Sequence, residues 1–164
     1  MKQILLATGL LALPCAVSST QGTAQVPANK QDDPRLERLR RFFAEYDSPL
    51  SKSAAEFLVA ADKNDLDWRL LPCISIIESG GGKVYTNNNV FGWDSARHSF
   101  ASVQAGILEV ADRLANSKLY KDKDLDSILS TYNPVPNYPS RVKALMRALG
   151  EGLDGEVALL LPKI

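Results

Sequence analysis

Apolar residues recur every three or four positions along most of the chain, which is the spacing of amphipathic helices. The clearest stripe combines Val103, Ile107, Val110, Ala111 and Leu114. Similar stripes predict five further helices, over residues 34–47, 51–63, 67–79, 125–132 and 139–149. No alternating pattern of useful length, as a half-buried strand would require, occurs before residue 155. The sequence therefore predicts an all-α fold, a small domain of about six helices.

Capping residues and helix breakers separate these stripes. Asp33 and Pro34 suit the N-cap and the first position of the first helix, and Ser51 suits the N-cap of the second. The glycines at 80–82 are expected to end the third helix, and Gly150 with Gly152 is expected to end the sixth. We expect these short-range signals to set the helix boundaries.

The N-terminal region has the pattern of an export signal. Lys2 precedes an apolar stretch over residues 4–17, which is too short to span a bilayer comfortably. Small residues allow cleavage after Ser18 or after Ala24. The predicted organisation is a signal peptide, a flexible spacer, a single helical domain that carries the function, and a tail, over residues 1–24, 25–33, 34–155 and 156–164. We expect a secreted or periplasmic protein with no stable membrane insertion after cleavage.

Two other interpretations of this region stay open. An uncleaved apolar stretch would act as a membrane anchor. Lipidation at Cys15 would tether the protein instead, although Pro14 stands where such sites usually carry a small residue. Fractionation separates these alternatives.

Composition and charge narrow the functional classes. The chain is 45% hydrophobic and 23% charged, as in ordinary globular proteins, and its 19 basic and 19 acidic residues cancel, so we expect no nucleic-acid partner. After signal removal Cys73 is the one cysteine, and we expect it to be a buried structural thiol. His98 is the one histidine, and nothing near it has the spacing of metal ligands, so we place it in a surface loop and expect no metal and no cofactor. The oligomeric state is left open.

Glu78 occupies an unusual position for an acidic residue. It follows Leu71 and Ile74 at helical spacing, so its carboxyl group projects from the apolar face near the end of the third helix. Burial and the negative end of the helix dipole should both raise its pKa and preserve its proton. Such a group can protonate the leaving oxygen of a glycosidic bond. The alternative is a glutamate at a frayed helix end that points to water.

The segment after this helix carries side chains that suit a sugar ligand. The amides of Asn87, Asn88 and Asn89 can bind hydroxyl and acetamido groups, and Trp93 can stack on a sugar ring. Asparagine also builds turns for backbone reasons, and Trp93 could instead anchor the core. Both interpretations are therefore carried forward.

Several ordered motifs between about residues 48 and 149 resemble the glucosaminidase branch of the lysozyme-like superfamily, which also includes lytic transglycosylases. They are LDWRLLP at 66–72, IIESGGGK at 76–83, NNVFGW at 88–93, SFAS at 99–102, KLY at 118–120, YNP at 132–134 and YPSRV at 138–142. The resemblance implies a helical domain that cuts β-1,4 bonds of peptidoglycan glycan strands. It also implies that Glu78 is the catalytic acid and that Tyr132 lines the cleft with Asn88, Asn89 and Trp93.

A second catalytic carboxylate is not evident from the sequence. Asp94 follows the NNVFGW motif and Glu109 lies on the fourth helix, but charged residues at such positions are commonly solvated. Enzymes of this kind can use the substrate's N-acetyl group, or its 6-hydroxyl group, in place of a second carboxylate. Hydrolase and lytic transglycosylase therefore both remain open, as does a non-catalytic wall-binding module on the same scaffold.

Overall fold

The computed structural model describes residues 33–151 of the chain. The predicted signal peptide, the spacer up to residue 32 and the tail lie outside these residues. The described part contains six α-helices, one 3-10 helix and no strand, which confirms the all-α prediction. The elements are α1 (Pro34–Glu45), η2 (Pro49–Ser53), α2 (Ala54–Lys63), α3 (Leu70–Ser79), α4 (Val103–Asn116), α5 (Leu125–Tyr132) and α6 (Tyr138–Glu151).

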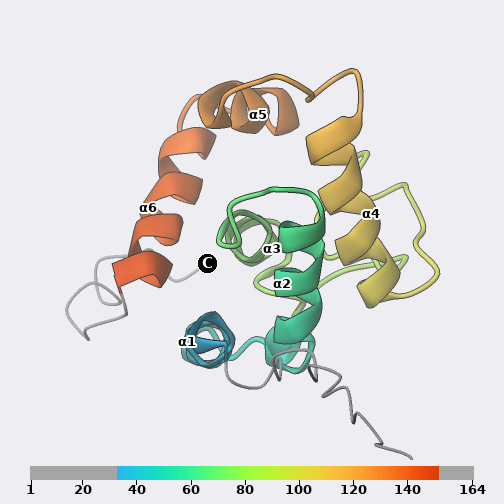
Figure 1. The fold of residues 1–164 in the computed structure, drawn as a ribbon. Coiled ribbons are helices and arrows are strands. Elements are labelled where there is room, and N and C mark those ends of the chain that lie inside the picture. Colours follow the sequence, from blue (N-terminus) through green and yellow to red (C-terminus); the bar gives the residue numbers. More distant parts are fainter. Residues whose placement is uncertain (1–32, 152–164) are drawn as a thin grey trace, which may run out of the picture.

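Helix α3 forms the centre of the domain, with the other helices arranged around it (Figure 1). It is apolar on nearly every side, which is typical of a helix with no solvent-facing stripe. Helices α2 and α6 pack against it. Cys73 lies in its first half and is fully buried, and burial raises the pKa of its thiol, as expected of a structural cysteine.

Local capping explains where α1 and α3 begin or end. The carboxylate of Asp33 accepts a hydrogen bond from the backbone N–H of Arg35 at 2.9 Å, as predicted for the N-cap of α1. Gly80 follows α3 in the left-handed conformation, with φ of 62°, and donates its N–H to the carbonyl of Ile76. This stop leaves Glu78 in the last turn of α3.

Two predicted boundaries are wrong, because side-chain contacts override the local pattern. Ser51 lies inside η2, and Ser48 caps that helix by accepting from the N–H of Leu50 at 3.2 Å. Helix α3 starts at Leu70 because the Asp67 carboxylate accepts from the N–H of Arg69 and holds the preceding residues in a turn.

Helix α6 continues through Gly150 to Glu151, the last described residue, and Gly152, the second glycine of the expected stop, lies outside the described residues. Gly150 packs closely on Arg69, since a Cβ atom there would lie 2.6 Å from Nη1 at the end of that flexible side chain. Its carbonyl also accepts a hydrogen bond from Arg38. No helix within residues 33–151 is long and apolar enough to cross a membrane.

Candidate active site

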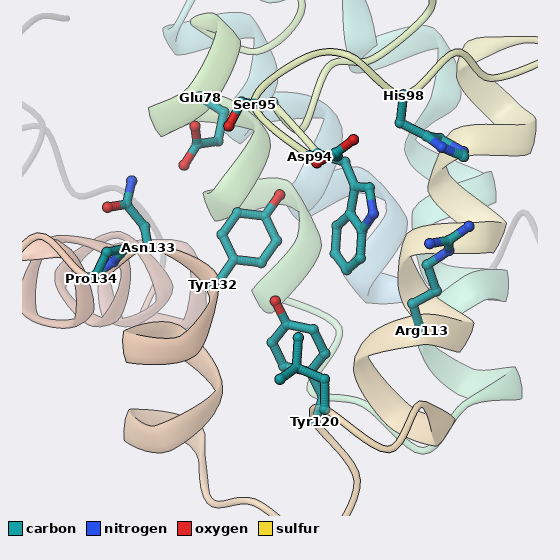
Figure 2. Close-up of a pocket in the computed structure, with 12 residues that line it drawn as sticks. Glu78, Asp94, Ser95, His98, Arg113, Tyr120, Tyr132, Asn133 and Pro134 are labelled. Atoms are coloured by element: carbon teal, nitrogen blue, oxygen red, sulfur yellow. The ribbon is translucent and has the colours of Figure 1, made fainter.

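A cleft of about 670 Å³ opens at the end of α3. Its walls come from the last turn of α3, the loop after it, α4 and the two connections that flank α5 (Figure 2). The lining residues are Glu78, Gly92, Trp93, Asp94, Ser95, His98, Arg113, Leu119, Tyr120, Tyr132, Asn133 and Pro134. Three residues expected from the sequence at the site, Glu78, Trp93 and Tyr132, therefore lie in one cleft.

The carboxyl group of Glu78 is half-buried at this cleft. Its Oε1 atom is buried and has no hydrogen-bond partner among the described residues. Burial raises the pKa of Glu78, and this effect outweighs the lowering by Tyr138, Asn133 and Arg141. In Figure 2 the Asn133 amide and the Glu78 carboxyl group lie on the same side of Tyr132. Glu78 is thus placed as a group that keeps its proton at a higher pH than an ordinary glutamate.

Gly92 lies directly against Glu78. Its φ is 61°, in the left-handed region, and a Cβ atom there would be 2.9 Å from Oε2 of Glu78. Glycine meets both demands at once, because it has no side chain and tolerates a positive φ. The loop can therefore close over the carboxyl group without displacing it.

Aromatic rings form the central wall of the cleft. Trp93 meets the ring of Tyr132 edge-on, with centroids 5.6 Å apart, and the ring of Tyr120 at 5.9 Å. The Arg113 guanidinium lies over Trp93, 5.6 Å from the ring centroid. The Tyr132 hydroxyl donates to the carbonyl of Phe91 at 2.5 Å. Tyr132 is therefore held as a wall of the cleft, with its hydroxyl engaged by the backbone.

The predicted asparagines serve the loop rather than the cleft lining. Asn89 is only 2% exposed, and its amide bonds the N–H and carbonyl of Trp93 and the carbonyl of His98. Asn88 donates to the carbonyl of Phe100 at 2.9 Å, and Asn87 donates to a backbone carbonyl at 3.2 Å. The structure thus places all three amides against backbone groups of the segment that carries Trp93.

The two candidate second carboxylates have different surroundings. Asp94 lines the cleft and forms an ion pair with Arg97 at 2.6 Å. Glu109 is absent from the lining, and its Oε1 atom is held by Arg113 at 2.5 Å and by His98 at 3.2 Å. Only Asp94 of this pair is therefore placed where it could face a bound glycan.

Five contributors to the site were not predicted from the sequence. Four of them stand inside recognised motifs, so their positions were the available signal: Gly92, Tyr120, Asn133 and Tyr138. Arg113 carried no such signal, because it reaches the site through helix packing. His98 does lie in a loop, as expected, but it is half-buried with its ring 4.5 Å from that of Phe100, and it lines the cleft.

Known proteins do not supply a function for this cleft. No protein-family model matches the chain, and no curated protein matches it. Within residues 33–151, no group of three or more His, Cys, Asp or Glu side chains is arranged to hold a metal ion. The chemistry of this cleft is therefore inferred from its own side chains and from the motifs that contribute them.

Proposed function

We propose that this protein is a glycosidase that cleaves β-1,4 bonds between N-acetylated sugars of peptidoglycan, with Glu78 as the proton donor. The observation that carries the proposal is the half-buried carboxyl group of Glu78, with its raised pKa, at an aromatic cleft. A general acid for glycosidic cleavage must hold its proton near neutral pH, and burial has this effect. The motif resemblance supports the choice of peptidoglycan as substrate.

The cleft offers the contacts that such a reaction needs. Tyr120, Trp93 and Tyr132 present ring surfaces and edges to the apolar faces of sugars, and the Asn133 amide can bind hydroxyl or acetamido groups. Glu78 then gives its proton to the departing oxygen as the bond to the anomeric carbon breaks. Three groups remain as candidates for the second catalytic role at the anomeric carbon: Asp94, the N-acetyl group of the sugar and its 6-hydroxyl group.

The proposed setting is the cell wall outside the cytoplasm. An export signal over residues 1–24 would deliver the domain to the secreted or periplasmic space, where its partners would be glycan strands. The proposed substrate lies outside the cytoplasm, so the substrate and the N-terminal export pattern both support this location.

Replacement of the proposed acid tests the function. We expect Glu78→Gln to lower the rate of peptidoglycan cleavage by about 100- to 10,000-fold, the usual contribution of general acid catalysis. Cleavage is measured by zymography and by release of soluble fragments. Glu56→Gln is the matched control, because Glu56 also has a buried carboxylate oxygen without a partner among the described residues but lies on α2, outside the cleft lining. Equal cleavage by wild type and Glu78→Gln would exclude Glu78 as the acid.

The same assay separates the remaining alternatives. Mass spectrometry of the fragments distinguishes reducing ends from anhydro ends, and hence hydrolysis from transglycosylation. A wild-type protein that sediments with insoluble peptidoglycan but releases nothing would instead be a wall-binding module. The ion pair between Asp94 and Arg97 is the feature that favours this second candidate, because it occupies the one other carboxylate of the described cleft lining.

A further inference from the structure

Two polar atoms at or near the cleft are each buried without a hydrogen-bond partner among the described residues. One is Oε1 of Glu78, and the other is the hydroxyl of Tyr138, whose side chain is 2% exposed. Buried polar atoms are nearly always paired, so an unpaired carboxyl oxygen beside an unpaired hydroxyl requires an explanation.

The two groups act on one another. Burial is the main cause of the raised pKa of each. Beyond burial, the Tyr138 hydroxyl lowers the pKa of Glu78, and the nearby carboxylate raises the pKa of Tyr138. The hydroxyl and the carboxyl group are thus close, although their geometry falls short of a formed hydrogen bond. In unliganded enzymes such contacts are commonly long and tighten when substrate binds.

The ring of Tyr138 has little freedom to turn away. It stacks on the ring of Tyr132, with centroids 6.0 Å apart and planes 9° from parallel. Tyr132 is fixed in turn by its hydrogen bond to Phe91. Tyr138 is also the first residue of α6, and its N–H bonds the carbonyl of Val135 at 2.9 Å. The hydroxyl is therefore held toward Glu78 from both the helix and the stack.

The two oxygens of Glu78 have different surroundings. Oε1 is buried, whereas Oε2 lies beside Gly92, which lines the cleft. We propose that the Tyr138 hydroxyl donates to Oε1 and thereby leaves the acidic hydrogen on Oε2, the oxygen beside the cleft. Tyr138 is then a positioning residue for the glycosidase reaction proposed above, on which this inference rests.

The proposed contact also assists proton release. As the bond between the anomeric carbon and the leaving oxygen breaks, that oxygen takes the hydrogen from Oε2, and Glu78 becomes a carboxylate. The Tyr138 hydrogen bond to Oε1 then strengthens, because its acceptor has become charged. The other groups that act on Glu78 are Asn133 and Arg141, which lower its pKa, and the Glu78 carboxylate in turn raises the pKa of Tyr132. The remaining ionisable side chains of the described cleft lining are Asp94, His98, Arg113 and Tyr120.

Replacement of Tyr138 by phenylalanine tests the inference. We expect Tyr138→Phe to move the alkaline limb of the pH profile of kcat/KM upward by about one pH unit, because one hydrogen bond to the carboxylate is lost. We also expect kcat to fall about tenfold, since the hydrogen is no longer directed to Oε2. The melting temperature at pH 4 should change by only a few degrees, because the carboxyl group is then protonated and the lost hydrogen bond has a neutral acceptor.

A matched control and a second measurement complete the test. Tyr46→Phe removes the hydroxyl of a half-buried tyrosine outside the cleft lining, and should leave the alkaline limb of the pH profile in place. NMR titration of the carboxyl carbon of Glu78 should show the same upward shift in Tyr138→Phe without any need for turnover. A wild type without activity would count against the proposed function alone. Coinciding titration curves for wild type and Tyr138→Phe would overturn the role of Tyr138.

Discussion

At the scale of single residues, the site depends on Glu78 and equally on the missing side chain of Gly92 beside it. Glu78 can be buried at the edge of the cleft because Gly92 leaves room for Oε2 and accepts a φ of 61°. Any L-residue at position 92 meets both the carboxylate and a disfavoured backbone conformation. The position of the Glu78 carboxyl group, and with it its burial and protonation, therefore depends on the glycine at position 92.

Alanine at position 92 tests this coupling. We expect Gly92→Ala to lose about 100-fold in peptidoglycan cleavage, because the new methyl group displaces the Glu78 carboxyl group. We also expect a loss of about 1–2 kcal/mol in stability from the positive φ. Gly80→Ala is the control, because Gly80 has nearly the same φ of 62° but ordinary contact distances of 3.7 Å. Similar activity in the two variants would contradict the prediction.

At the scale of structural elements, the loop after α3 positions the aromatic wall through backbone hydrogen bonds. Ser79 donates to the carbonyl of Val90 at 2.7 Å and accepts from the N–H of Gly82, which ties the loop to its helix. Asn89 then holds both Trp93 and the residue at position 98. These side-chain hydrogen bonds thus hold the irregular loop between α3 and α4 in place, although it contains no helix or strand.

Removal of the Asn89 amide tests its role in the loop. We expect Asn89→Leu to lower the free energy of unfolding by about 3 kcal/mol, since three part-buried backbone groups lose their partner. Asn87→Ala, at an exposed position with one long hydrogen bond, should cost only about 1 kcal/mol, mainly because its φ of 55° disfavours alanine. Urea denaturation measures both. An Asn89→Leu protein with unchanged stability and a raised KM would show instead that this amide binds the sugar.

At the scale of the whole molecule, the proposed acid opposes folding at neutral pH. The pKa of Glu78 is raised in the folded state by burial above its ordinary value of 4.5. Below that value the carboxyl group is protonated in both the folded and the unfolded chain, so it has no effect on stability relative to a neutral side chain. As pH rises through the folded-state pKa, the unfolded chain releases its proton more readily, and stability is lost.

This linkage predicts a pH-dependent gain in stability for Glu78→Gln. We expect the variant to melt at a higher temperature than wild type near pH 7, with a difference that shrinks toward zero at about pH 4. Asp33 and Asp67 affect both proteins equally, because ion pairs with arginine lower their pKa values in each. Scanning calorimetry between pH 4 and pH 7 measures the difference. A constant difference across this range would indicate that burial does not oppose ionisation of Glu78.

The sequence by itself determined the helices and their buried faces, and it singled out Glu78. Helical periodicity, the Asp33 cap and the Gly80 stop depend on residues within about one turn of each other, so they can be read without a fold. A carboxyl group on an apolar stripe beside that stop is equally local. These signals are short-range, which is why they were sufficient.

Only the tertiary structure decided which distant groups meet Glu78. Tyr138 and Arg141 approach from α6, Gly92 approaches from the loop, and Asn89 turns its amide toward the backbone. Arg38 of α1 likewise donates to the carbonyl of Gly150 in α6, 112 positions along the chain. Such pairings arise when helices separated by many residues pack together, and no spacing rule along the chain encodes them.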